Sequence, residues 1–96
     1  MAAAHLKKID VSYDRVADVL YISFGRPRKG IAFELNDGNL VRIDPFKGTV
    51  VGITIIDFKE RYMPSKNRTI EESARELVPK LLSQYQHEVN RQSKAC

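Results

Sequence analysis

Two aspartates that frame a short connection are the first candidates for chemistry in this sequence. Asp14 and Asp18 lie four positions apart, directly after an alternating segment that ends at Tyr13. A pair of carboxylates brought together can share acid and base work, or hold a hard cation such as magnesium. The alternative is structural, because aspartates beside turns often accept hydrogen bonds from nearby backbone N–H groups. No histidine, cysteine or serine motif adjoins the pair, so the sequence favours the structural role.

Cationic side chains gather in two polar segments and are the second candidates. One segment is a loop around Pro27 and the other is a predicted linker before the C-terminal helix; the cations are Arg26, Arg28, Lys29, Lys59, Arg61, Lys66 and Arg68. Cations beside an aromatic such as Tyr62 suit phosphate contact and base stacking in a nucleic-acid-binding protein. Charged segments are more often simply solvated, and Glu60 interrupts the second one. Nucleic-acid binding is therefore the weaker of two functional hypotheses.

The composition is that of one ordinary globular domain. The 96 residues are 43% hydrophobic and 29% charged, which predicts a single domain over residues 1–96. The 16 basic against 12 acidic residues give a net charge of +4, mildly favourable for polyanionic partners. The apolar runs fall far short of the roughly 20 residues that span a membrane, and no apolar stretch of signal-peptide length lies near Met1. We expect a cytoplasmic protein without membrane contact.

Cysteine and histidine are too sparse to predict a metal centre. Cys96 is the single cysteine and stands at the end of the sequence, which excludes an internal disulfide and a multi-cysteine zinc site. His5 and His87 lie far apart, and neither has a second histidine or cysteine at ligand spacing. The sequence predicts no metal and no cofactor.

The chain pattern predicts a β-sheet core over residues 8–58. Apolar and polar residues alternate, or β-branched and aromatic residues concentrate, in five segments bounded by turn residues: 8–13, 19–24, 31–35, 40–44 and 49–58. The second and fifth segments are apolar on both faces, which indicates central strands. Residues 36–39 predict a tight hairpin, Gly52 a bulge or close backbone approach, and Tyr13 and Tyr21 are expected in the core.

A helix is predicted after a linker over residues 59–68. Thr69 and Glu72 match a capping box, and apolar residues then recur every three or four positions through the segment 69–92. Pro79 interrupts this stripe, so the helix should be kinked or broken there. The predicted fold class is α+β: a curled antiparallel β-meander of about five strands, followed by this helix.

Three runs in the sheet segment resemble a known series. They are Tyr13-Asp14-Arg15-Val16-Ala17-Asp18-Val19-Leu20-Tyr21-Ile22, then Glu34-Leu35-Asn36-Asp37-Gly38, then Val50-Val51-Gly52-Ile53-Thr54-Ile55-Ile56-Asp57. They are similar to the small prokaryotic family known as domain of unknown function 2283, over roughly residues 8–58. The resemblance implies a short curled meander. It carries no established activity and no agreed catalytic residues, so it transfers no mechanism.

The favoured function is that of a non-enzymatic interaction module. We expect a homodimer that buries the second apolar faces of strands two and five, and a partner protein is a further option, for example a toxin that this protein neutralises. A nucleic-acid-associated protein that uses the two basic segments is the alternative. An enzyme built on Asp14 and Asp18 comes third.

Overall fold

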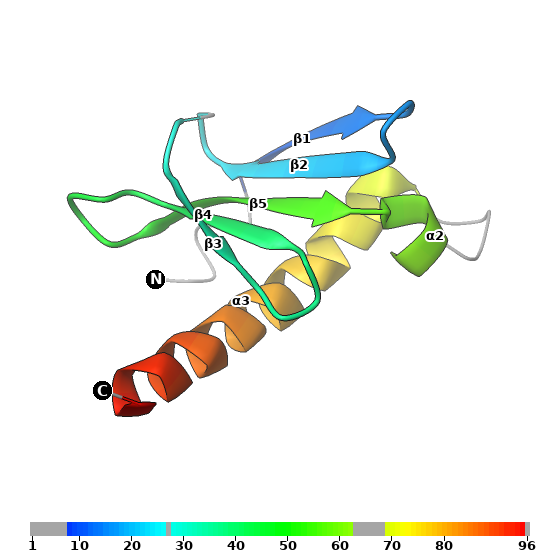
Figure 1. Ribbon diagram of the computed structural model, residues 1–96. Helices are drawn as coiled ribbons and strands as arrows, with labels where there is room; N and C mark the ends of the chain where they lie inside the picture. The colour runs from blue at the N-terminus through cyan, green and yellow to red at the C-terminus, as the bar shows by residue number, and fades with distance from the viewer. Residues whose placement is uncertain (1–7, 27, 63–68, 96) are drawn as a thin grey trace.

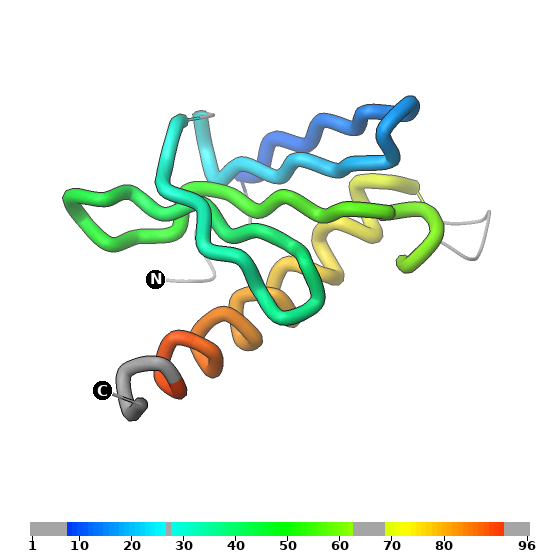
Figure 2. The backbone as a smooth tube through the Cα atoms, viewed as in Figure 1, coloured from blue at the N-terminus to red at the C-terminus, as the bar shows by residue number. Residues whose placement is uncertain are grey.

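The computed structural model describes residues 8–26, 28–62 and 69–95, with side chains as far as residue 91. An open sheet lies against one long helix (Figures 1 and 2), so the predicted α+β class is confirmed. The elements, in chain order, are β1 (Ile9–Asp14), β2 (Val19–Phe24), β3 (Ile31–Glu34), β4 (Leu40–Ile43), β5 (Val50–Ile56), α2 (Phe58–Tyr62) and α3 (Ile70–Ala95).

The strand order is β1-β2-β5-β4-β3, and every neighbouring pair is antiparallel. A simple meander would place β3 beside β2, but β5 takes that position instead. The reason lies in the apolar character of both faces of β5, which favours an interior place over an edge. The β3–β4 hairpin therefore lies at one edge of the sheet, with β3 as the edge strand.

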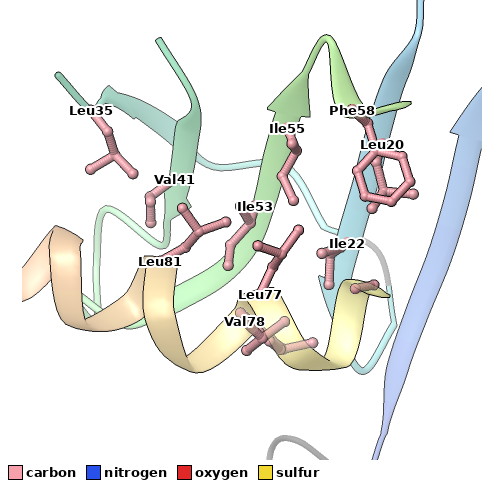
Figure 3. Close-up of a cluster of buried hydrophobic side chains, with 12 residues drawn as sticks. Leu20, Ile22, Leu35, Val41, Ile53, Ile55, Phe58, Leu77, Val78 and Leu81 are labelled. Atoms are coloured by element: carbon pink, nitrogen blue, oxygen red, sulfur yellow. The ribbon is translucent and has the colours of Figure 1, made fainter. Parts of the chain in front are cut away.

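One face of the sheet packs against α3 and forms the core. Residues directly opposite each other on paired strands point to the same side, so the register that joins Val11, Ile22, Ile53, Val41 and Phe33 places all five on this inner face. Figure 3 shows three of them, Ile22, Ile53 and Val41, beside the buried side chains of the helix. The fully or almost fully buried hydrophobic residues are Leu20, Ile22, Phe24, Leu35, Val41, Val51, Ile53, Ile55, Phe58, Ala74, Leu77, Val78 and Leu81.

The long helix begins at the capping box that the sequence predicts. The Thr69 N–H donates to Glu72 Oε1 at 3.0 Å, and the Glu72 N–H donates to Thr69 Oγ1 at 3.0 Å. The helix then continues through Pro79 as one element, so of the two predicted alternatives, a kink or a break, the break does not occur. Pro79 is exposed, and the apolar stripe stays in phase on both sides of it. No helix among the described residues is long and apolar enough to cross a membrane.

The predicted hairpin at residues 36–39 is present and is tied to α3. Gly38 adopts a left-handed φ of 92° and donates its N–H to the Leu35 carbonyl at 2.9 Å. The buried carboxylate of Glu88 accepts from the Asn36 N–H at 3.1 Å and 3.2 Å, one distance for each oxygen. The Gln84 amide also donates to Glu88, at 2.9 Å. A buried charge is thus satisfied at the contact between helix and hairpin.

The structure corrects two predictions, one for the end of the sheet and one for Tyr21 in β2. The segment expected to be a linker begins with α2, because Asp57 turns the chain with a left-handed φ of 50°. That turn carries Phe58, which the sequence assigned to the fifth strand, into the core and leaves it fully buried. Tyr21 was expected in the core, but it lies on the face away from α3 and is 41% exposed.

Candidate functional site

Asp14 forms the turn between β1 and β2. Its Oδ1 accepts hydrogen bonds from the N–H groups of Val16 and Ala17, at 3.0 Å and 3.1 Å. This is the Asx-turn geometry in which an aspartate side chain stands in for a backbone acceptor. The carboxylate therefore holds the local loop.

Asp18 joins the same turn to the start of α2. Its φ of 57° lies in the left-handed region, which aspartate tolerates better than most residues. Its backbone carbonyl accepts from the Phe58 N–H at 3.0 Å, and its Oδ1 accepts from the Lys59 N–H at 2.9 Å. Tyr13 adds a hydroxyl hydrogen bond to Oδ1 at 2.6 Å. Asp18 thus caps a helix that lies far along the chain from it.

These hydrogen bonds shift the pKa values of both Asp18 and Tyr13. The Lys59 backbone N–H, followed by the Tyr13 hydroxyl, stabilises the charged carboxylate and lowers the pKa of Asp18 below its ordinary value. The same hydrogen bond to Asp18 raises the pKa of Tyr13. Asp14 and Asp18 therefore serve different backbone donors. Catalytic use of the two aspartates remains a prediction without a supporting contact between them.

The contribution of Asp18 to stability should be visible in how the melting temperature changes at acid pH. Because its pKa is lower in the folded than in the unfolded chain, the carboxylate stabilises the fold above the unfolded pKa, and this contribution is lost as the pH falls through the folded pKa. We expect Asp18→Asn to melt at a lower temperature at pH 7 and to lose less on acidification than the wild type. Melting temperatures followed by circular dichroism between pH 7 and pH 2 test this. Parallel curves for the two proteins would contradict the assignment.

A second polar cluster holds α2 against the β3–β4 hairpin. Asn39 is fully buried, and its Oδ1 accepts from the Ile56 N–H at 3.1 Å and from Arg61 at 3.2 Å. Its amide donates to the Tyr62 hydroxyl at 2.9 Å. Arg61 also pairs with Asp37 at 3.5 Å and lies over the Tyr62 ring. Arg61 is thus engaged in structural contacts.

Arg42 lies flat across the outer face of the sheet, the face away from α3. Its guanidinium passes over Gly52 on β5 and donates to the Ile22 carbonyl at 3.2 Å and to Ser23 Oγ at 3.0 Å, both on β2. A Cβ at Gly52 would overlap that guanidinium, which explains the glycine. The pairing also shifts between Arg42 and Ile43, so the predicted bulge lies next to Gly52, whereas the group that approaches Gly52 closely is the Arg42 side chain and not a backbone.

The two basic segments lie at opposite ends of the sheet. Asp18, at the start of β2, contacts Lys59, whereas Arg26 follows the far end of the same strand (Figure 1). Six residues of strand separate the two ends by roughly 15–20 Å. Lys59 additionally lies over the Tyr13 ring, 5.9 Å from its centroid. Lys66 and Arg68 lie outside the described residues. The structure therefore does not join these cations into one site.

A hollow beside the first basic loop carries no signal in the sequence. It has a volume of about 440 Å³ and lies between Lys29 and Gly30 on one side and Asp44, Pro45 and Phe46 on the other. The Phe46 side chain is 96% exposed. The residues around Phe46 predict a turn after a strand. They do not predict that this turn lies next to the loop that contains Lys29 and Gly30.

Asp44 shapes the second wall of this hollow. Its Oδ1 accepts from the N–H groups of Phe46 and Lys47, at 2.8 Å and 3.2 Å. These two bonds, with a smaller contribution from the nearby Arg28 charge, lower the pKa of Asp44. The carboxylate is consequently occupied with the turn that presents Phe46.

These elements define a small α+β domain, an open five-stranded antiparallel sheet with one long helix on one face. The chain belongs to the family described as Protein of unknown function (DUF2283), whose model matches residues 10–59. The match extends from β1 to the first turn of α2 and leaves α3 outside. Comparison with curated proteins found no match, and comparison with solved structures found none.

Proposed function

We propose that this protein is a non-enzymatic interaction module that associates with a second copy of itself through the outer face of the sheet. The observation that carries the proposal is a mostly apolar group on the three central strands, here called the outer patch: Val19, Tyr21, Leu40, Thr54 and Ile56. The register places Tyr21, Thr54 and Leu40 in one row across β2, β5 and β4, with Val19 and Ile56 in the next. No described helix lies over this face (Figure 1).

The composition of the outer patch favours association over simple exposure. An antiparallel sheet commonly turns a polar face to water, but the outer patch places a tyrosine and aliphatic side chains at the centre of that face. Tyrosine is enriched in protein interfaces, where its ring is buried and its hydroxyl remains available for a hydrogen bond. Arg42 is held against the sheet by Ser23 and the Ile22 carbonyl, so a flat partner surface can approach beside it.

A second copy is the partner that this surface suits. Two identical sheets can pack face to face at about 10 Å, and a two-fold axis lets one patch meet itself. The inner face of each sheet remains covered by its own α3. Neither Asp14 nor Asp18 lies within the outer patch, so the proposal makes no use of them.

A charge in the outer patch should separate the copies. We expect the wild type to sediment as a dimer at tens of micromolar and Tyr21→Glu to sediment as a monomer, because a buried unpaired carboxylate is strongly disfavoured. Val16→Glu is the matched control, since Val16 is 99% exposed in the β1–β2 turn. It should remain a dimer. Circular dichroism confirms that each variant is folded.

A monomeric wild type at these concentrations would contradict self-association. A different protein on the same face, such as a toxin that the module neutralises, is the alternative occupant. Pull-down from the host lysate with wild type and Tyr21→Glu separates the two cases. One stoichiometric foreign protein, absent with Tyr21→Glu, would indicate a heterologous partner, whereas recovery of the untagged chain itself supports the dimer.

A further inference from the structure

We propose that the hollow between the β2–β3 and β4–β5 loops binds single-stranded nucleic acid, with Phe46 as the stacking platform and the surrounding cations as phosphate contacts. The site uses no residue of the outer patch, so it is independent of self-association. It also differs from the sequence-based hypothesis, which joined the first basic loop to cations at the opposite end of the sheet.

Close packing and hydrogen bonds fix the positions of the two loops that form the walls of the hollow. Gly30 lies so close to β4 that an added Cβ would stand 2.8 Å from the Ile43 carbonyl oxygen. On the other side, Asp44 closes the turn by accepting from the Phe46 and Lys47 N–H groups. The Asp44 N–H in turn donates to the Thr49 carbonyl at 2.8 Å. A site organised before binding requires less ordering when a ligand arrives.

Phe46 has no packing role in its own domain. Its ring is 96% exposed, in contrast to Phe24 and Phe58, which are 9% and 0% exposed. An exposed aromatic ring offers a π-face to a nucleobase, and such stacking tolerates any base. The volume of the hollow, about 440 Å³, falls in the range of small-ligand sites. It therefore suits an unstacked nucleotide.

The segments at the end of the sheet that presents Phe46 carry more cations than anions. The segments at this end of the sheet carry Lys8, Arg26, Arg28, Lys29 and Lys47, with Asp44 among them. Lys8 belongs here because its carbonyl accepts from the Gly25 N–H at 2.8 Å. The segments at the other end carry Asp14, Asp18, Asp37, Asp57 and Glu60 with Arg15, Lys59 and Arg61. A polyanion is therefore attracted to the end that presents Phe46.

The combination favours a single strand over other anionic partners. In a duplex the bases are stacked on one another, so the ring would have no free base to contact. An anionic bilayer would be held by the cations, but stable membrane attachment needs more buried apolar surface than one ring provides. An acidic peptide would use the charges and gain little from the ring. Among these polyanionic partners, a single strand is the one that uses both.

Fluorescence anisotropy tests the proposal on the full chain. The probe is a labelled single-stranded oligonucleotide of about ten nucleotides, a length that one small binding domain can cover. The wild type should bind at about 50 mM salt and weaken steeply as the salt is raised. Phe46→Ala should weaken binding roughly fivefold or more, the effect of removing one base stack. Arg28→Gln combined with Lys29→Gln should reduce the slope of log K against log salt by about 0.7 for each phosphate that the protein no longer neutralises.

Two exposed positions away from the hollow supply matched controls. Val16→Ala removes an exposed apolar side chain at the acidic end, and Lys80→Gln removes a charge from the exposed side of α3. Both should bind as the wild type does. Absence of binding at about 50 mM salt, where phosphate-driven binding is strong, would overturn the proposal, as would unchanged binding by Phe46→Ala. Equal affinity for a duplex, for polyglutamate or for anionic lipid vesicles would also overturn it, because such binding would not depend on a free base.

Discussion

Phe58→Ala is expected to cost about 3–5 kcal/mol of unfolding free energy, a large part of the roughly 5–15 kcal/mol that a domain of this size has. The ring is fully buried and meets Tyr13 edge-on, with centroids 5.8 Å apart. It also packs beside Tyr62, at 6.4 Å. Removing it leaves a cavity where β2, β5 and α2 meet. Urea unfolding followed by circular dichroism measures the loss.

The same substitution at an exposed site is the control for this experiment. Phe46→Ala should change the unfolding free energy by no more than about 0.5 kcal/mol, because its ring is 96% exposed. A loss below about 1 kcal/mol in Phe58→Ala would show that the ring is not packed as described. The comparison also establishes that Phe46→Ala is folded, which the binding experiment requires.

Asn39→Ala is expected to be the second most damaging change, at roughly 2–4 kcal/mol. Asn39 is fully buried, and its side chain serves the Ile56 N–H, Arg61 and the Tyr62 hydroxyl together. Alanine removes the acceptor of the Ile56 N–H and the donor to the Tyr62 hydroxyl, while Arg61 keeps its pair with Asp37. An unsatisfied buried donor costs more than an average hydrogen bond contributes.

Asn36→Ala in the same turn is the control for Asn39. Its side chain is exposed, and the contact with Glu88 uses the Asn36 backbone N–H, which alanine retains. Urea midpoints of the two variants should therefore differ widely at unchanged slope. Similar midpoints would mean that the buried network around Asn39 does not hold α2 in place.

Local patterns in the sequence predicted the elements and several of their contacts. Alternation over residues 8–13 predicted β1, and the turn residues at 36–39 predicted the hairpin that joins β3 to β4. The capping box of Thr69 and Glu72 predicted where α3 begins. Each of these features depends on residues within a few positions of one another. The family could also be recognised, because its pattern lies within the strands themselves.

Functional surfaces were harder to predict because they combine distant segments. The sequence placed Tyr21 in the core because both faces of β2 are apolar, and nothing in β2 alone says whether the second face is covered within the chain. It grouped Arg26 with Lys59 by composition, although the strands carry them to opposite ends of the sheet. Phe46 has no distinguishing pattern around it, because its importance arises only where the turn after β4 meets the loop after β2.

By itself, the sequence determined an α+β domain of this family, with its strands, its hairpin and its capped helix. Only the tertiary structure decided that β5 enters between β2 and β4, that Asp57 turns Phe58 into the core, and that Asp18 caps α2. The physical reason is the range of the interactions. Propensity, capping and turn geometry act over a few residues, whereas strand order and shared burial depend on pairings between segments far apart in the chain.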